Sequence, residues 1–299
     1  MKENRNNEII ENFDNLVMSP LANPIIDAIF ASEKTAGLAA ESIIRVILEE
    51  EGINRSFGKV IKVTPQRSRS YPYQRGSRVD VEILTENNEI ALVEIQISDD
   101  PSMMQRNLYS TSHVLTEKSI PGTTSAQMAV DMPTIIAINI LSKSLRKDND
   151  EVLQPFKIMY TKPPIREAVP QFTGYNIQLD KIPSMKQDFN SGFYCWFYTL
   201  YTAHKENKTI EEVLKMAPEL IAYTEQDAGY MQFCKQYDLA TGDPESRRMY
   251  RNWFLDEWSR QAQEQHAIQK GREEGINNVL SLLESGHTLE EIKTMFNLQ

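Results

Sequence analysis

The sequence predicts an α/β protein in which a mixed β-sheet is flanked by helices, followed by a C-terminal region made only of helices. Three observations support this fold class. Two runs of alternating apolar residues flank a turn-prone loop between residues 79 and 97, which is typical of a β-hairpin. An amphipathic helical segment precedes the hairpin and an apolar strand follows it. Beyond about residue 183 the apolar spacing is that of helices.

The predicted hairpin joins its two strands through the loop 85–89. If Leu84 pairs with Ile90, the antiparallel register places Asp80 opposite Glu94, and opposite residues share one face of a sheet. That face carries acids and an amide, whereas the other face is apolar throughout and is expected to face the core. A loop that differed by one residue would undo this opposition.

Two opposed carboxylates repel each other, so Asp80 and Glu94 are not expected to face each other for stability alone. A divalent cation between them would remove that cost, and Mg²⁺ prefers carboxylate oxygens together with waters and phosphates. The alternative is a solvated polar face whose acids keep the edge of the sheet soluble.

The same residues resemble a known family. Asp80, a hairpin and then Glu94-Ile95-Gln96 resemble the D…E-x-Q form of the PD-(D/E)XK motif in the recombination-promoting nucleases, also described as PD-(D/E)XK family transposases. The resemblance extends over most of the chain, through segments in the same order: Met18-Ser19-Pro20-Leu21, the helix Ile25 to Phe30, Arg106 and Tyr109, the strand 132–141, and Gly271-Arg272-Glu273-Glu274-Gly275.

The resemblance implies a restriction-endonuclease-like core and a metal-dependent DNA endonuclease. We expect a nuclease-like domain at 1–183 and a helical region at 184–299 that ends in a small helix pair. Asp80, Glu94 and the backbone carbonyl of Ile95 would hold Mg²⁺ or Mn²⁺, and Asp80, Glu94 and Gln96 would be the catalytic residues. Gln96 stands where the wider superfamily has lysine. Because an amide only donates and accepts hydrogen bonds, we expect a slow enzyme or one that needs more metal.

A basic stretch runs directly into Asp80. Residues 52–79 contain seven Lys and Arg residues and no acid, although the whole chain has a net charge of −10. Arginine side chains hold phosphates without reading sequence, so we expect contacts to DNA from Arg67, Arg69, Arg75 and Arg78. The alternative is a solvated basic loop that balances an acidic protein.

Two helices are expected beside the hairpin. The first, Ala36 to Glu51, is amphipathic and ends at Gly52. The resemblance makes its Glu41 a possible additional acid; otherwise Glu41 is a surface residue. The second helix follows Pro101 and carries Arg106 and Tyr109 within about one turn of each other, so that both can project toward a nucleic acid. The alternative is an ordinary, partly exposed helix surface.

Further strands are expected at 132–141, 156–161 and 175–179, and helices after them. The aromatic segment 193–201 is expected to be a helix packed on the core. Thr209 and Thr288 each precede a glutamate by three residues, the pattern of a capping box. Asp243-Pro244 begins a long helix. The last segment is expected to form a pair of helices. Such pairs usually pack on the rest of the protein or form the contact of a homo-oligomer.

Composition and the pattern of apolar residues bear on the location of the protein and on the kinds of site it can contain. The 299 residues are 40% hydrophobic, the first residues lack the pattern of a secretory signal, and no apolar run approaches the roughly 18 residues that span a membrane, so we expect a cytoplasmic protein. Cys195 and Cys234 are expected to be buried thiols, and the four scattered histidines do not have the spacing of a zinc site. A catalytically inactive DNA- or protein-binding module with the nuclease fold is the alternative function, and a hydrolase of small phosphate compounds is a third.

Overall fold

The computed structural model describes residues 16–30, 35–53, 57–69, 77–97, 102–118, 122, 124–145 and 149–296. The chain divides into two compact units, Met1–Tyr250 and Arg251–Gln299. The first unit contains the sheet together with the helices up to residue 242. These helices therefore belong to the same compact unit as the sheet, and the domain boundary expected at residue 183 stays a prediction.

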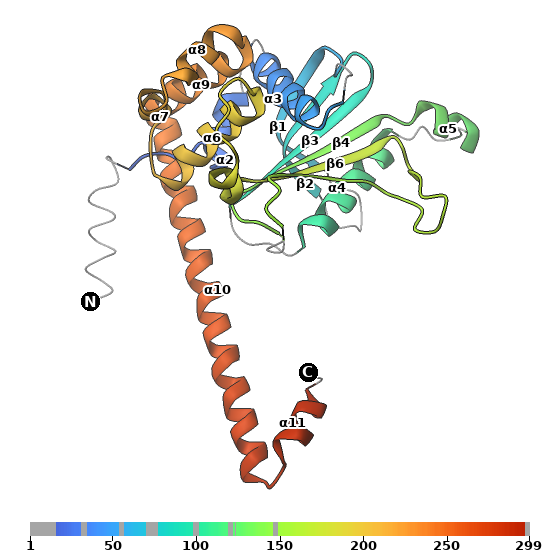
Figure 1. Ribbon diagram of the computed structural model, residues 1–299, viewed down its shortest axis with the longest axis vertical. Coiled ribbons are helices and arrows are strands. Elements are labelled where there is room, and N and C mark those ends of the chain that lie inside the picture. Colours follow the sequence, from blue (N-terminus) through green and yellow to red (C-terminus); the bar gives the residue numbers. More distant parts are fainter. Residues whose placement is uncertain are drawn as a thin grey trace. The chain divides into compact units, whose positions relative to one another are not determined.

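The first unit is built on a mixed six-stranded sheet with the strand order β1-β2-β3-β4-β6-β5 (Figure 1). The first three strands pair antiparallel, β3 pairs parallel with β4 and β4 with β6, and β5 is antiparallel to β6. The predicted mixed sheet is confirmed. The strands are β1 (Val60–Arg69), β2 (Ser77–Thr85), β3 (Glu89–Gln96), β4 (Thr134–Leu141), β5 (Leu153–Phe156) and β6 (Phe172–Gln178).

The hairpin of β2 and β3 has the predicted register. Leu84 pairs with Ile90, and the ladder continues without a shift to Val81 and Val93. Asn88 has a φ of 57°, in the left-handed region that asparagine tolerates better than most residues. The turn therefore fixes the side-chain pairing from Leu84 with Ile90 to Val81 with Val93.

Helices cover both faces of the sheet (Figure 1). Helix α4 (Met103–Lys118) packs on one face, where Val114 joins a cluster with Ile90 and Leu92. On the other side lie α2 (Asn23–Phe30), α3 (Ala36–Glu50) and α6 (Gly192–Lys205). The face with the acids is therefore buried beneath α4 and is not a solvated surface. Val79, which strict alternation places on the opposite face, belongs to the same cluster as Leu92.

Two strands differ from the sequence-based expectation. Strand β1 lies within the basic stretch and was not predicted, because its Lys, Arg and Pro residues lack an alternating apolar pattern; its pairing with β2 holds it in the sheet. Strand β5 ends at Phe156, so the prediction of a strand over 156–161 was wrong. A Cβ at Gly174 would lie 1.9 Å from the Phe156 ring, which shows how closely the ring covers β6. Helix α5 (Ser125–Asp131) was also not predicted.

The helices of residues 179–242 complete the first unit. They are the 3-10 helix η2 (Leu179–Ser184), α6, α7 (Ile210–Met216), α8 (Glu219–Gln226) and α9 (Ala228–Gly242). The aromatic helix α6 is buried as expected, with Trp196 only 1% exposed. Thr209 and Glu212 form the predicted capping box.

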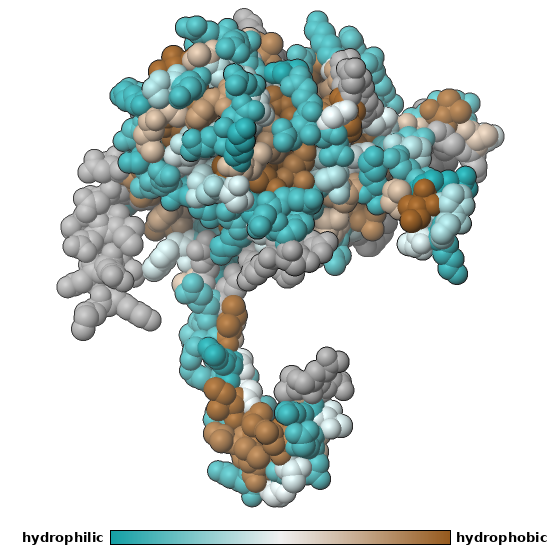
Figure 2. All heavy atoms as spheres, viewed as in Figure 1, coloured by the Kyte–Doolittle hydropathy of each residue, from teal (hydrophilic) through white to brown (hydrophobic). Residues whose placement is uncertain are grey.

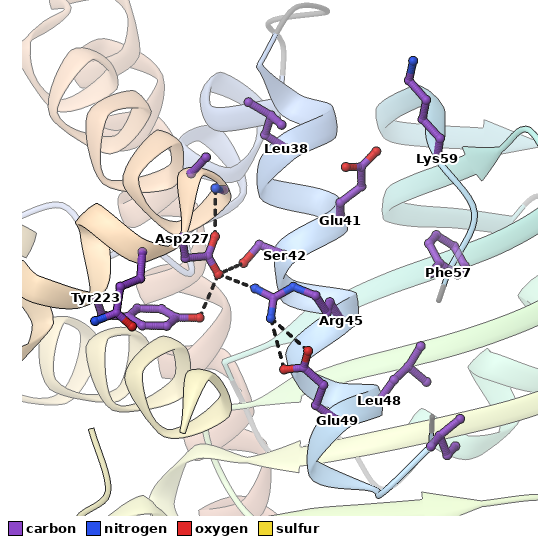
Figure 3. Close-up of a pocket in the computed structure, with 14 residues that line it drawn as sticks. Leu38, Glu41, Ser42, Arg45, Leu48, Glu49, Phe57, Lys59, Tyr223 and Asp227 are labelled. Atoms are coloured by element: carbon purple, nitrogen blue, oxygen red, sulfur yellow. Dashed lines mark hydrogen bonds and ion pairs between the residues drawn. The ribbon is translucent and has the colours of Figure 1, made fainter. Parts of the chain in front are cut away.

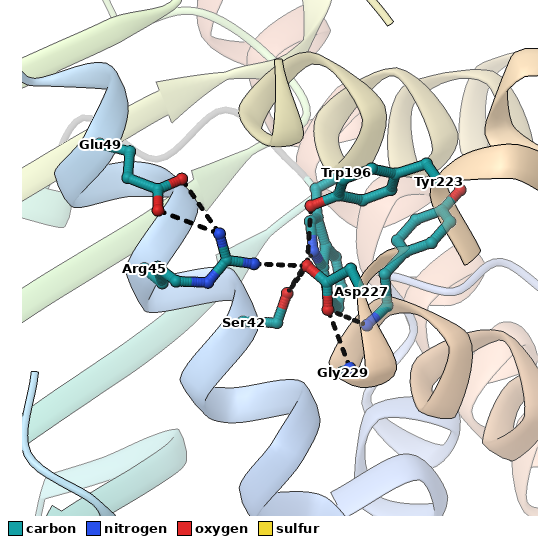
Figure 4. A network of polar contacts seen from close by, with 8 residues as sticks. Ser42, Arg45, Glu49, Trp196, Tyr223, Asp227 and Gly229 are labelled. Atoms are coloured by element: carbon teal, nitrogen blue, oxygen red, sulfur yellow. Dashed lines mark hydrogen bonds and ion pairs between the residues drawn. The ribbon is translucent and has the colours of Figure 1, made fainter. Parts of the chain in front are cut away.

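A buried carboxylate joins this helical part to α3 (Figure 4). Asp227, at the start of α9, accepts hydrogen bonds from the Ser42 hydroxyl at 2.6 Å and the Tyr223 hydroxyl at 2.7 Å, and it forms an ion pair with Arg45 at 2.5 Å. It also accepts from two backbone N–H groups of α9. Burial alone would raise the pKa of this carboxyl, but these donors and the nearby Arg45 hold it below its usual value.

The long helix α10 (Pro244–Glu284) passes from the first unit into the second and continues through Gly271 and Gly275 without a break. In the second unit, Gly286 has a φ of 91° and ends the helix. The short α11 (Leu289–Met295) then begins with the predicted capping box. Apolar side chains gather on the surface where α10 and α11 meet (Figure 2); they include Ile276, Leu280, Leu283 and Leu289.

Candidate active site

The two acids of the hairpin lie buried next to each other at the end of the β2–β3 ladder. Asp80 and Glu94 follow the last printed pair of the ladder, Val81 with Val93, and they are only 8% and 3% exposed. The backbone N–H of Ile95 donates to the Asp80 carboxylate (N···Oδ2 2.7 Å). Two carboxylates on neighbouring strands, shielded from water, repel each other strongly unless a positive charge lies close by.

Helix α4 brings one positive charge to this pair. The Arg106 guanidinium lies 3.2 Å from Oε2 of Glu94 and donates to Oε1 of Gln96 at 3.1 Å. Arg106 is itself 43% exposed. Both Arg106 and Tyr109 were predicted to point toward the substrate, and the structure brings Arg106 to the acids. The Tyr109 ring packs against His113, with their centroids 4.5 Å apart.

The backbone places part of the basic stretch beside the acids. Arg67 pairs with Val79, the residue before Asp80, and Arg78 lies two residues before Asp80 on β2. The side chains of Arg67, Arg69 and Arg78, and the whole of Arg75, lie outside the described residues. Their contact with DNA therefore stays a prediction.

The structure does not bring Glu41 to the hairpin acids. Its carboxylate accepts a hydrogen bond from the N–H of Val60 at 2.8 Å, and Val60 pairs with Thr85 at the far end of β2. Five strand residues separate Thr85 from Asp80, which is about 17 Å. Glu41 instead lines an open pocket of about 780 Å³ between α3, the start of β1 and the α8–α9 turn (Figure 3). Arg45 and Asp227 lie on the wall of the same pocket.

A buried asparagine next to Glu94 was not singled out from the sequence. Asn139 of β4 pairs with Glu94 in the parallel register and is completely buried. Its Nδ2 donates to Oδ1 of Asn176 on β6 at 2.7 Å. The available signal was a polar residue inside an otherwise apolar buried strand, Ile-Ala-Ile-Asn-Ile-Leu. Because a buried amide is costly unless it is bonded, such a residue indicates a specific role.

A second polar cluster lies where β4 ends. The backbone N–H of Ser142 donates to the carbonyl of Gln96 at 2.8 Å, and its hydroxyl contacts Nε2 of His204 at 3.0 Å and Nζ of Lys205 at 2.8 Å. The Ser19 hydroxyl contacts the other ring nitrogen of His204 at 2.8 Å. Burial, assisted by the charge of Lys205, lowers the pKa of His204 to about 4. The imidazole is therefore neutral near pH 7.

The donor set beside the hairpin suits a hard divalent cation. Asp80 and Glu94 provide carboxylate oxygens on adjacent strands, and Ile95 provides a backbone carbonyl between Glu94 and Gln96. Oxygen ligands of this kind match the preference of Mg²⁺ and Mn²⁺. Within the ranges that the structure describes, no three His, Cys, Asp or Glu side chains cluster in a way that could hold a metal. Cys195 and Cys234 are free and buried, as predicted.

Fold and site together define a nuclease-like protein of the restriction-endonuclease type, with a mixed sheet, helices on both faces and paired acids on the central hairpin. Comparison with family models gives the more specific result. Residues 27–267 match the PD-(D/E)XK nuclease family transposases, and the chain belongs to this family. The searches of curated proteins and of solved structures found no match. No helix among the described residues is long and apolar enough to cross a membrane.

Proposed function

We propose that the protein is a metal-dependent endonuclease that cleaves DNA by hydrolysis of a phosphodiester bond. The observation that carries this proposal is the burial of Asp80 and Glu94 on adjacent strands of the central hairpin. Arg106 neighbours this pair of like charges, and a divalent cation is a partner that such a pair can hold and use. Membership of the nuclease-transposase family supports the same reaction class.

In this proposal Asp80, Glu94 and the carbonyl of Ile95 hold Mg²⁺ or Mn²⁺. The cation would lower the pKa of a bound water and stabilise negative charge on the phosphate. The hydrogen bond from Ile95 to Asp80 keeps the carboxylate in a fixed orientation. That rigidity favours a defined ligand geometry over a mobile one.

In this proposal Gln96 and Arg106 together replace the lysine found elsewhere in the superfamily, which orients the water and supplies a positive charge. The Gln96 amide orients water by hydrogen bonding, and its bond with Arg106 fixes which end of the amide faces the guanidinium. Arg106 supplies the positive charge that an amide lacks. It is partly exposed and lies 3.2 Å from Glu94, so it can turn toward a phosphate once a cation neutralises Glu94.

The proposed substrate is DNA. Its phosphates would be contacted by four arginines of the basic stretch, Arg67, Arg69, Arg75 and Arg78. A cytoplasmic location belongs to the same proposal. A homo-oligomer formed through the C-terminal helices is supported by the exposed apolar side chains where α10 meets α11 (Figure 2). Such clusters on a surface commonly mark an interaction site.

Nicking of supercoiled plasmid tests the proposal. The purified protein is incubated with Mg²⁺, Mn²⁺, Ca²⁺ or EDTA, beside the variants Asp80→Ala and Glu94→Ala and the matched control Glu86→Ala, which removes an exposed acid from the hairpin turn. We expect cleavage that requires Mg²⁺ or Mn²⁺, is lost in both site variants and is retained by the control.

Absence of cleavage with every metal, or equal cleavage by all variants, would refute the nuclease assignment. The alternative of an inactive DNA- or protein-binding module would then take its place. A titration of DNA binding against salt then distinguishes a DNA-binding module from a protein-binding one. Phosphate contacts release counterions and make DNA binding steeply salt-dependent.

A further inference from the structure

The carboxyl ends of three parallel strands meet at the edge of the sheet where the proposed metal site lies. Strands β3, β4 and β6 run parallel and end in register, with Gln96 beside Leu141 and Leu141 beside Gln178. In open α/β sheets, ligands bind outside the carboxyl ends of such strands. The residues that directly follow β4 and β6 are therefore placed to contact a substrate that reaches Glu94 and Gln96.

Two lysines lie at this edge, one directly after β4 and one at the end of α6. The backbone N–H of Ser142 donates to the Gln96 carbonyl at 2.8 Å, and the Lys205 ammonium donates to the Ser142 hydroxyl at 2.8 Å. These two bonds place the ammonium within about 9 Å of the Gln96 carbonyl oxygen. Lys143 follows Ser142 in the chain, and both lysines are exposed.

The two lysines have donors that the described part of the chain does not use. Lys205 has three N–H donors but one hydrogen-bond partner there, and Lys143 forms no ion pair there. The carboxylate of Asp180 acts on Lys205, but its oxygens accept from the N–H and the hydroxyl of Ser144, at 2.9 and 2.5 Å. Partial burial of the ammonium lowers the pKa of Lys205; the charge of Asp180 opposes this effect and that of Lys143 adds to it. Two neighbouring cations with unused donors favour the binding of an anion.

We propose that Lys143 and Lys205 bind the DNA backbone on the β4 side of the site, at a phosphate next to the one that is cleaved. Lysine ammonium groups hold phosphate oxygens as point charges without reading the base sequence. The basic stretch lies on the β1–β2 side of β3, so the substrate strand would be held on both sides of Glu94 and Gln96. This inference rests on the proposed DNA endonuclease function and adds two residues to its binding surface.

Binding of a fluorescently labelled DNA duplex to the full-length protein tests the assignment without relying on cleavage. Fluorescence anisotropy is measured at several salt concentrations, with Ca²⁺ in place of Mg²⁺. The variants are Lys143→Gln and Lys205→Gln, which remove the charge, and Lys205→Arg, which keeps it. Lys215→Gln is the matched control, because it removes an exposed lysine of α7 that pairs with Glu211. Thermal unfolding verifies that each variant is folded.

We expect each glutamine variant to weaken DNA binding by roughly 3- to 10-fold at about 0.1 M salt and to lower the slope of log Kd against log salt by about 1. Lys205→Arg and the control should stay within about twofold of the wild type.

If either glutamine variant keeps the wild-type affinity and slope, the contact from that lysine is refuted, whereas the nuclease proposal stands. Weaker binding with an unchanged salt slope also refutes the contact, because the loss of a phosphate contact must reduce the number of counterions released. If inorganic phosphate at the same ionic strength displaces the DNA, the lysines bind a small phosphate compound and the DNA assignment is wrong. A wild type that binds no DNA would refute both proposals.

Discussion

Replacement of Asp80 by asparagine should stabilise the metal-free protein and at the same time remove its stabilisation by metal. Asparagine has the shape of aspartate and keeps an oxygen that accepts the Ile95 N–H, so the hydrogen bond at 2.7 Å is retained. What changes is the charge beside Glu94. The substitution therefore isolates the electrostatic cost of the paired acids from their packing.

The size of the effect follows from the spacing of side chains on adjacent strands. Opposed side chains in an antiparallel pair have Cβ atoms about 5 Å apart, and two unit charges at that separation repel by about 3 kcal/mol at an effective dielectric constant of about 20. Arg106, 3.2 Å from Glu94, offsets part of this repulsion. We expect a net gain of about 1 to 2 kcal/mol, which corresponds to roughly 2 to 6 °C in the melting temperature of a domain of this size.

The assay is thermal unfolding followed by circular dichroism, in EDTA and over a Mg²⁺ or Mn²⁺ titration. A cation that binds only the folded state stabilises the wild type by about 2.7 kcal/mol at 100 times its Kd, and this gain should be absent from Asp80→Asn. The control Glu86→Gln removes the same charge from an exposed position in the hairpin turn and should behave like the wild type. A variant less stable than the wild type in EDTA, or a wild type whose melting temperature does not respond to metal, would contradict the reasoning.

Three further predictions concern the rest of the first unit. Because burial, with the charge of Lys205 nearby, lowers the pKa of His204 to about 4, the unfolded chain binds a proton below about pH 6.5 that the folded chain does not, so stability should fall between pH 6.5 and 4; urea unfolding should show a loss of roughly 3 kcal/mol that is absent from His204→Gln. Burial raises the pKa of Cys195 and of Cys234 to about 12, so neither thiol should react with a thiol reagent at pH 8 until the protein is unfolded, and rapid native labelling would contradict this. Asp227→Ala removes a buried carboxylate that pairs with the half-exposed Arg45 and accepts four other hydrogen bonds, and should cost about 2 to 4 kcal/mol in urea unfolding; a loss below about 1 kcal/mol would show that water replaces the carboxylate.

Local sequence patterns predicted the features whose causes lie within a few residues. The alternation in the hairpin and its turn set the register of Leu84 with Ile90, and hence place the two acids at the same end of the ladder. The capping boxes at Thr209 and Thr288 and the end of α3 before Gly52 depend on bonds within one helical turn. The motif Asp80, Glu94-Ile95-Gln96 likewise indicated the family that the comparison confirmed.

Tertiary structure decided the features that depend on residues far apart in the chain. Strand β1 has no apolar alternation of its own and is held by β2. Arg106 reaches Glu94 only because α4 crosses the sheet at that point, and Ser42 and Arg45 bond to Asp227 across more than 180 residues. A buried polar atom gives little local signal, because its partners come from other elements; the buried amide of Asn139 beside Glu94 became visible only in the folded sheet.

The sequence by itself thus determined the class of fold, the hairpin and its two acids, since periodicity and turn chemistry act over short distances along the chain. Only the folded chain decided which charges and amides surround those acids. The physical reason is that the packing of α4 against the sheet, not the order of residues, sets the distances over which ion pairs, hydrogen bonds and metal ligands act.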